Sequence, residues 1–234
     1  MDIREVNTSE SFEVEINDWW VQARYRELIQ NISFKQKSMV VDIGCGSAQN
    51  LYFLCRDYPH LKLIGVDHES AQIDYNWLSK RVEIINTVEG KIFDSNVFLL
   101  MDVLEHIDKD QEFLSQIVER AKHGSEFFIS VPSFPVLWSQ RDVELGHFRR
   151  YTNKTIRDLC ANSGLTIDSC YYKYSFLFLV LFLVRKRIKS VGIESRWGRS
   201  SGIVTKILDS LCRLEEKIPK LPIGTSIILV GYKE

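Results

Sequence analysis

The chain has 234 residues, of which 45% are hydrophobic and 26% are charged. This length and balance predict a single folded domain over residues 1–234 and exclude a disordered or fibrous chain. The formal net charge of -1 offers no general attraction for nucleic acid, so we do not expect nucleic acid as a partner unless a local basic stripe recruits it.

The cysteines and the first residues of the chain bear on its location. The cysteines are widely and irregularly spaced and form no CxxC pair, which predicts neither a disulfide framework nor a zinc ribbon. The first residues, MDIREVNTSE, lack the basic start and apolar core of a secretory signal. Both features favour a cytoplasmic location.

The first predicted element is a helix over residues 18–32, with Asn17 or Asp18 as its cap and apolar residues at helical spacing. Strands and helices then alternate, which is typical of a parallel sheet with helical crossovers. Helices are predicted between the first strand and Pro59, over residues 111–121, and from Thr152 to Asn162. Strands are predicted over residues 39–43, 61–66, 82–85, 97–101, 127–131, 165–172 and 226–232.

Residues 174–222 form a long excursion between the last two strands, which we interpret as a helical insertion or cap because structureless loops of this length are uncommon. An apolar run from Phe176 to Val184 precedes the basic residues 185–189, RKRIK. The run is too short to cross a bilayer as a helix. Residues 174–191 are therefore expected to pack internally, to pair with another subunit, or to make a peripheral contact with a membrane.

A group of small residues follows the first predicted strand. Gly44, Cys45 and Gly46 lie where this strand turns into a helix, so a ligand can approach the backbone there. An isolated glycine pair also fits an ordinary turn. Asp67 ends the next strand, where a carboxylate can accept hydrogen bonds from both hydroxyls of a ribose. The two features together predict a site for a nucleoside-containing cofactor.

These motifs, in this order, resemble class I methyltransferases, with DIGCGSA as the first motif and Ala48 in place of its last glycine. The resemblance implies an α/β fold with a Rossmann-like, seven-stranded, mostly parallel sheet in the order 3-2-1-4-5-7-6. It implies S-adenosylmethionine as the cofactor. A dehydrogenase is less compatible, because the third glycine of GxGxxG is missing. The cofactor-binding residues implied are Asp42, Gly44, Cys45, Gly46, Asp67, His68, Asn86, Thr87, Asp102 and Val103.

Residues 19–24, WWVQAR, resemble the WWxxxR motif of a subgroup near ubiquinone O-methyltransferases and polysaccharide-cluster methyltransferases. The resemblance implies that residues 1–36 form an N-terminal lid with Trp20 beside the cofactor. Arg24 would pair with the cofactor carboxylate through its planar guanidinium group. The alternative is that the tryptophans pack in the core.

The candidate reacting groups lie in residues 146–152, GHFRRYT, after the fifth predicted strand. We interpret His147 as a general base, because its near-neutral pKa suits removal of a proton from a substrate hydroxyl. Arg149 and Arg150 are expected to hold an anionic substrate. The alternative is a loop before a helix with solvated charges.

A divalent metal ion is a second possibility for this region. Asp102, Glu105, His106 and His147 offer oxygen and nitrogen ligands. Their pattern resembles the metal-binding ExxEH of ubiquinone O-methyltransferases and small-RNA 2′-O-methyltransferases, with Asp102 replacing the first Glu. In the alternative, Glu105 starts a helix and His106 packs beneath the cofactor.

The sequence therefore predicts a methyltransferase that transfers a methyl group to an oxygen, or less readily a nitrogen, of a small or lipid-linked metabolite. An RNA methyltransferase and a non-catalytic S-adenosylmethionine-binding protein are the alternatives. The sequence does not determine the acceptor or the oligomeric state.

Overall fold

The computed structural model describes residues 9–68, 81–179, 182, 203–218 and 220–234. Its centre is a seven-stranded sheet with the order β3-β2-β1-β4-β5-β7-β6, which confirms the predicted fold class. The strands are β1 (Met39–Ile43), β2 (Lys62–Val66), β3 (Val82–Ile85), β4 (Val97–Met101), β5 (Glu126–Pro132), β6 (Leu165–Lys173) and β7 (Ser226–Lys233).

The sheet is mostly parallel. β1 pairs in parallel with β2 and β4, β2 with β3, and β4 with β5. β7 runs antiparallel to both β5 and β6, and the β6–β7 register shifts between Ile167 and Ser169. The carboxyl ends of all strands except β7 therefore meet at one edge, where parallel α/β sheets bind their ligands.

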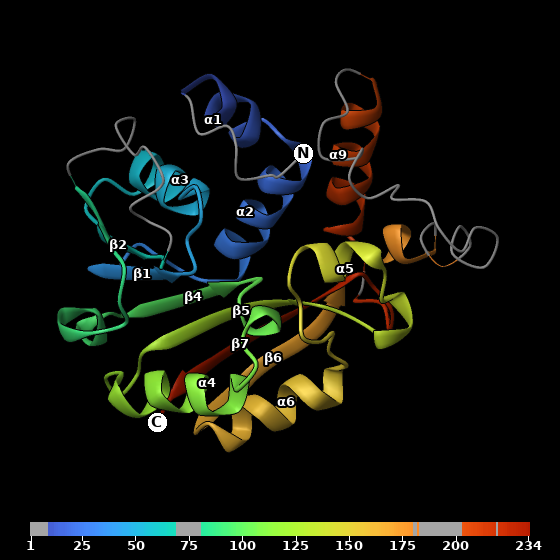
Figure 1. Cartoon of the computed structure of the whole chain (residues 1–234). Coiled ribbons are helices and arrows are strands. Elements are labelled where there is room, and N and C mark those ends of the chain that lie inside the picture. The colour runs from blue at the N-terminus through green and yellow to red at the C-terminus, as the bar shows by residue number, and fades with distance from the viewer. Residues whose placement is uncertain (1–8, 69–80, 180–181, 183–202, 219) are drawn as a thin grey trace.

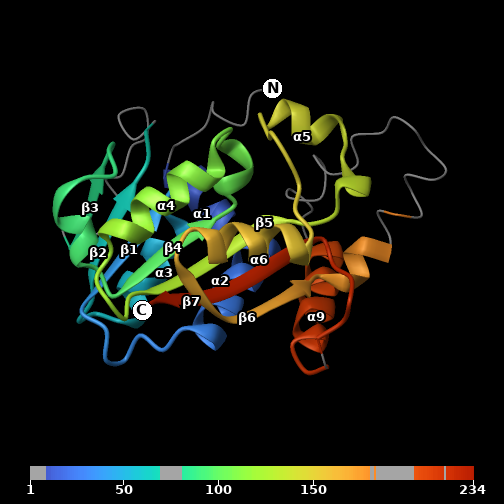
Figure 2. The same cartoon turned by 90° about the horizontal axis from the view of Figure 1, so that it is seen from below.

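Helices cover both faces of the sheet, which explains why every residue of β1 and β4 is buried. Val40 and Leu99 pack toward α2 and α3, whereas Val41 and Phe98 pack toward α4 and α6. Figures 1 and 2 show these two helical layers with the strands between them. The helices are α2 (Trp19–Asn31), α3 (Gln49–Asp57), α4 (Asp110–Arg120) and α6 (Asn153–Asn162).

The N-terminal region contains one predicted helix and one that the sequence pattern did not indicate. Asp18 caps α2, and its carboxylate accepts a hydrogen bond from the Trp20 amide at 2.8 Å. α1 (Ser9–Ile16) precedes it. Its apolar residues alternate as in a strand, but the Phe12 ring packs edge-on against Tyr52 at 5.4 Å between centroids. Tertiary packing therefore overrides the local period.

Short helical segments fill the connections along the carboxyl edge. These are η4 (Leu104–His106) after β4, and η5 (Pro135–Leu137) and α5 (Gln140–Glu144) after β5. η3 (Gly90–Asp94) connects β3 to β4. Thr152 caps α6 as expected, and Gly164 follows the helix with a φ of +89°.

The excursion between β6 and β7 contains helix in its described parts. Residues 175–179 are helical, and α9 (Ile203–Glu215) packs beside α2 rather than over the strands (Figure 1). Residues 183–191 of the proposed membrane-contact segment lie outside the described residues. Within the described part of the chain, none of the helices has the length and apolar character needed to cross a bilayer.

Candidate active site

The glycine turn after β1 combines tight packing with open space. Gly44 has a φ of +69°, and a Cβ placed on it would lie 2.7 Å from Cγ2 of Val103. Gly46 has a φ of +51°, but a Cβ there would meet no heavy atom of the described residues within 4 Å. Ala48, at the departure from the glycine motif, also has a left-handed backbone with a φ of 59°. Gly44 is thus required for packing, whereas the described residues leave space for a larger group beside Gly46.

The structure brings Asp67 to this turn. The Gly46 amide donates a hydrogen bond to Oδ2 of Asp67 at 2.9 Å, so the carboxylate after β2 holds the loop after β1. His68 is exposed beside it, and Asn86 and Thr87 are exposed at the end of β3. The expected ribose and adenine residues therefore lie at neighbouring strand ends.

Arg24 reaches from α2 to the end of β4. Its Nη1 lies 2.9 Å from Oδ2 of Asp102, and the Ser130 hydroxyl donates to the other carboxylate oxygen at 3.2 Å. Asp102 has a φ of +59°, a strained conformation that often marks functional sites when the residue is not glycine. Arg24 is therefore paired within the protein, and its expected pairing with the cofactor carboxylate stays a prediction.

An aromatic contact closes this part of the site. The Trp20 and Tyr174 rings lie 4.5 Å apart between centroids. Tyr174 is buried with a φ of +61°, and its hydroxyl has no hydrogen-bond partner among the described residues. Burial raises the Tyr174 pKa well above its usual range. Both rings line a narrow cavity of about 10 Å³ that also includes Arg24, Asp102 and Ser130.

His147 is held by a buried carboxylate. Its Nδ1 lies 2.9 Å from Oδ1 of Asp142, and Arg150 binds both oxygens of the same carboxylate at 2.7 and 3.0 Å. Burial alone would raise the Asp142 pKa, but the hydrogen bonds from His147 and Arg150 outweigh it and hold that pKa well below its usual range. The result is an ionised Asp142 beneath the imidazole.

His106 and Glu105 adjoin this pair. The His106 and His147 rings meet edge to face, with 4.6 Å between centroids. Burial and the neighbouring His147 lower the His106 pKa, and burial and the Asp102 charge raise the Glu105 pKa. One ligand atom each from Glu105, His106 and His147 lies within 4.8 Å of the others. Asp102, the fourth expected metal ligand, is paired with Arg24 outside this group.

Arg149, the neighbour of Arg150 in this loop, has partners of its own. Arg149 binds the carboxylate of Asp110 at 2.7 Å and the carbonyl oxygen of Asp108 at 2.6 Å. Tyr151 donates a hydrogen bond to the other oxygen of Asp110 at 2.7 Å. Arg149 and Arg150 are thus both ion-paired, and their expected role toward an anionic substrate stays a prediction.

The structure brings together two groups of polar residues that were not predicted from the sequence. The first is Asp142 with its partners, and it had a local signal, because Ser139 and Asp142 form a capping box at the start of α5.

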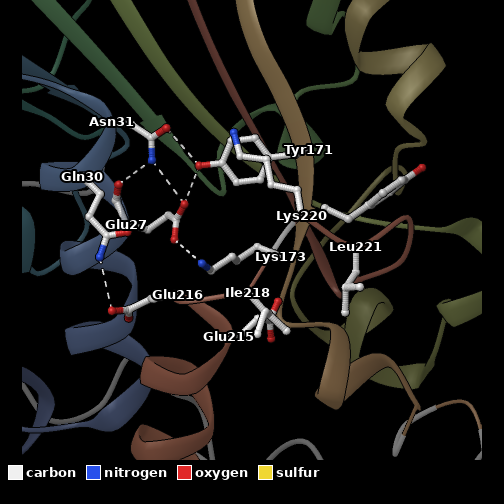
Figure 3. Close-up of a pocket in the computed structure, with 11 residues that line it drawn as sticks. Glu27, Gln30, Asn31, Tyr171, Lys173, Glu215, Glu216, Ile218, Lys220 and Leu221 are labelled. Carbon is white, nitrogen blue, oxygen red and sulfur yellow. Dashed lines mark hydrogen bonds and ion pairs between the residues drawn. The ribbon is translucent and has the colours of Figure 1, made fainter.

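The second group lines a cavity of about 240 Å³ between α2, β6 and the chain after α9 (Figure 3). There Glu27 pairs with Lys173 at 2.8 Å and accepts a hydrogen bond from Tyr171. These contacts had no local signal, because their residues lie far apart in the chain.

Comparison with known families explains the arrangement at the strand ends. A family described as a methyltransferase domain matches residues 18–169. The chain belongs to this methyltransferase family. The match covers the glycine turn, Asp67, the segment after β4 and the His147 loop, but it does not confirm the proposed subgroup.

Solved structures show the same fold at low sequence identity. A S-adenosylmethionine-dependent methyltransferase from Archaeoglobus fulgidus superposes with a TM-score of 0.56 at 18% identity, over 92% of this chain and 93% of that one. Phosphoethanolamine N-methyltransferase 2 from Haemonchus contortus, in complex with S-adenosylmethionine, has a TM-score of 0.59 at 17% identity. That alignment covers 97% of this chain and 57% of the other. No curated protein matches the sequence.

The motifs, the fold and the family agree on S-adenosylmethionine as the cofactor of this methyltransferase. The residues present fit such a group. None of the described residues fills the space that a Cβ on Gly46 would take, and the adjacent Asp67 carboxylate suits a ribose. Val103, after β4, packs tightly on Gly44 of the same turn.

Proposed function

We propose that this methyltransferase methylates a hydroxyl oxygen of a small or lipid-linked acceptor, with His147 as the general base. The observation that supports this proposal is the Asp142–His147 pair in the loop that follows β5. An oxygen nucleophile becomes effective when a positioned base removes its proton. A base held by a buried carboxylate is therefore suited to remove the proton of a hydroxyl acceptor.

Cofactor binding is assigned to the carboxyl ends of β1, β2 and β4. When bound, S-adenosylmethionine supplies an electrophilic methyl group. Asp67 would accept hydrogen bonds from the ribose, and Asn86 or Thr87 would lie near the adenine. Gly46 leaves room for close approach to the backbone, and Trp20 and Arg24 of α2 would cover the methionine end.

His147 has the hydrogen bonding that a general base needs. The ionised Asp142 favours a proton on Nδ1, which leaves Nε2 to accept a proton from the acceptor hydroxyl. Arg150 keeps Asp142 ionised through its two contacts with the carboxylate. His106 lies against the His147 ring, and its lowered pKa keeps it neutral near pH 7, so it adds no competing charge.

The class of acceptor is argued from the chain and from its structural neighbours. The neighbours include Mitomycin 7-O-methyltransferase and a phosphoethanolamine N-methyltransferase, so the fold is compatible with both oxygen and nitrogen acceptors. Net charge of -1 disfavours RNA. The apolar residues 176–184 beside the basic residues 185–189 favour an acceptor that is attached to a lipid. Tyr174 and Leu177 are buried in a core cluster with Trp19, so the membrane contact proposed for residues 174–191 falls on the remainder of that segment.

A metal-dependent reaction is the second candidate, because Glu105, His106 and His147 place three potential ligand atoms together. A divalent ion there would lower the pKa of a bound hydroxyl and replace the base. The two candidates give His147 different roles, as a proton acceptor or as a ligand.

The test compares His147→Ala with the wild type in a methyl-transfer assay against quinone precursors, glycolipids and RNA. We expect turnover to fall about a hundredfold to ten-thousandfold, the usual contribution of a general base, with S-adenosylmethionine affinity unchanged. His123→Ala is the matched control, because His123 is an exposed histidine in the loop after α4.

Loss of S-adenosylmethionine affinity in step with turnover would show that His147 is structural. Chelation separates the two candidates in the same assay. Activity that survives complete chelation supports the base, whereas activity that is lost and then restored by magnesium or manganese supports the metal ligand.

A further inference from the structure

α9 has two faces of different character, and its inner face is packed against α2. Leu208 and Cys212 join an apolar cluster with Trp19 and Ala23 of α2. Polar contacts border this cluster, because Arg26 of α2 pairs with Asp209 at 2.9 Å and with Glu216 at 2.8 Å. The helix is therefore anchored along one side.

The opposite face of α9 is apolar and exposed. Ile207, Leu211 and Leu214 follow one another at helical spacing, and their exposed fractions are 52%, 36% and 59%. They line a surface hollow of about 360 Å³ together with Lys206 and Ser210. These three apolar residues are called the α9 stripe below. Scattered apolar side chains on a surface need no explanation, but an aligned row indicates an interaction site.

The charged residues of α9 and of the chain just after it differ between the side that faces the protein and the exposed side. The carboxylate of Asp209 is paired with Arg26 and Arg213, and Glu215 accepts hydrogen bonds from Ser175. Lys206 and Lys217 are exposed, and neither forms an ion pair with a described residue. Asp209 and Glu215 of the helix thus bind partners within the protein, whereas the two exposed lysines are free to present positive charge beside the stripe.

We propose that the α9 stripe and the lysines beside it bind the interface of an anionic membrane. An apolar row with a basic border is the pattern by which amphipathic helices lie in a lipid headgroup layer. A second copy of the chain is less compatible. A two-fold interface through the stripe would bring Lys206 and Lys217 close to those of the partner, and like charges repel. The proposal does not depend on the acceptor or on the role of His147.

The first experiment is vesicle flotation of the full chain with neutral phosphatidylcholine and with mixtures containing phosphatidylglycerol. We expect the wild type to float with anionic vesicles and to dissociate at high salt. The variant Ile207→Ser, Leu211→Ser and Leu214→Ser should bind at least about tenfold more weakly, since three apolar side chains no longer enter the lipid. Because these side chains are exposed, the variant should fold, and its thermal unfolding checks this.

A matched control replaces three exposed apolar residues elsewhere. Val14, Val136 and Val143 have exposed fractions of 65%, 65% and 56%. Their replacement by Ser should leave flotation at the wild-type level. This control separates loss of the α9 stripe from a general loss of apolar surface.

A charge variant keeps the test decisive if the apolar variant does not fold. Lys206→Gln with Lys217→Gln should weaken binding to anionic vesicles about thirtyfold, at roughly 1 kcal/mol per lysine, and leave binding to neutral vesicles unaffected. Lys35→Gln with Lys154→Gln is the control, because both lysines are exposed away from α9. This control should bind as the wild type does.

Three outcomes would overturn the proposal. The wild type could fail to bind any vesicle, or the α9 variants could bind as well as the wild type, which would place the contact elsewhere, for example in residues 174–191. The third outcome is a dimer in solution that the apolar substitutions convert to a monomer without vesicle binding. That result would assign the stripe to a second copy of the chain.

Discussion

Asp42 and Asp142 are both buried carboxylates near the carboxyl edge of the sheet, yet their pKa values shift in opposite directions. Asp142 accepts hydrogen bonds from His147 and Arg150, which stabilise its charge. Asp42 accepts one from the neutral amide of Asn50 at 3.2 Å, and burial raises its pKa to about 7. A neutral donor does not offset the loss of hydration. The two residues therefore differ in charge state because their partners differ.

The raised pKa of Asp42 makes the stability of the protein dependent on pH. The ordinary pKa is 3.8, so the unfolded chain ionises this group well before the folded chain does. The contribution of protonated Asp42 to the free energy of unfolding is fully present below about pH 4 and is lost as the pH rises through about 7. Asp42→Asn should remove this dependence and gain on the order of 4 kcal/mol over the wild type between pH 4 and pH 8.

Urea unfolding of both proteins without cofactor at pH 4.5, 6 and 8 measures this difference. If the advantage of Asp42→Asn does not grow with pH, the folded protein holds Asp42 ionised and the interpretation of its burial is wrong. If the free energies of unfolding of the two proteins differ by the same amount at all three pH values, the difference reflects packing of the asparagine amide instead.

α2 connects three parts of the molecule through nearby polar residues. Arg24 reaches Asp102 at the end of β4, Arg26 reaches α9, and Glu27 reaches Lys173 on β6. The same helix carries Trp20 beside Tyr174. A displacement of α2 would therefore change the site and the position of α9 together.

The contact between α2 and α9 can be tested by Arg26→Met, which keeps most of the side-chain volume and removes the charge. Arg26 is mostly buried between the carboxylates of Asp209 and Glu216. We expect a loss of about 1–3 kcal/mol in the free energy of unfolding, since two partly buried carboxylates lose a partner. Denaturant unfolding measures it.

Arg213→Met is the matched control, because Arg213 pairs with the same Asp209 but its side chain is 58% exposed. Arg213→Met should lower the free energy of unfolding by no more than about 0.5 kcal/mol. Equal costs for the two variants would show that burial of Arg26 does not strengthen the contact.

Over the whole molecule, the cofactor would join loops that belong to separate strands. The ends of β1 and β2 already touch through Gly46 and Asp67, and Val103 after β4 packs on Gly44. A ligand bound across these loops stabilises the folded state in proportion to its occupancy.

We therefore expect S-adenosylmethionine at a hundred times its dissociation constant to add about 2.7 kcal/mol and to raise Tm by roughly 5–10 °C. Asp67→Ala should reduce this shift at the same concentration, because the ribose loses its acceptor. Differential scanning fluorimetry measures both, and the Tm without ligand checks the fold. The assignment of Asp67 is wrong if the variant shows the wild-type shift and affinity.

Much of the fold was predictable because its signals are local. Each strand is a short apolar run, and the alternation with helices indicates a parallel sheet. The glycine turn and Asp67 follow strands directly, so their shared edge could be inferred from the connectivity. α1 was missed, because its apolar residues follow a strand period and it is held by the packing of Phe12.

Hydrophobic period and turn residues predicted an α/β sheet and the loops that carry chemically capable residues, because these signals act between near neighbours. The order of the strands followed from the resemblance of the motifs to class I methyltransferases. The tertiary structure decided which of those residues meet. Arg24 pairs with Asp102, and Asp102 thus leaves the group formed by Glu105, His106 and His147. Tertiary packing also determined which face of α9 is exposed, because the other face lies against α2. Such contacts depend on side chains far apart in the chain, and only packing determines which of the many possible charge partners lies within reach.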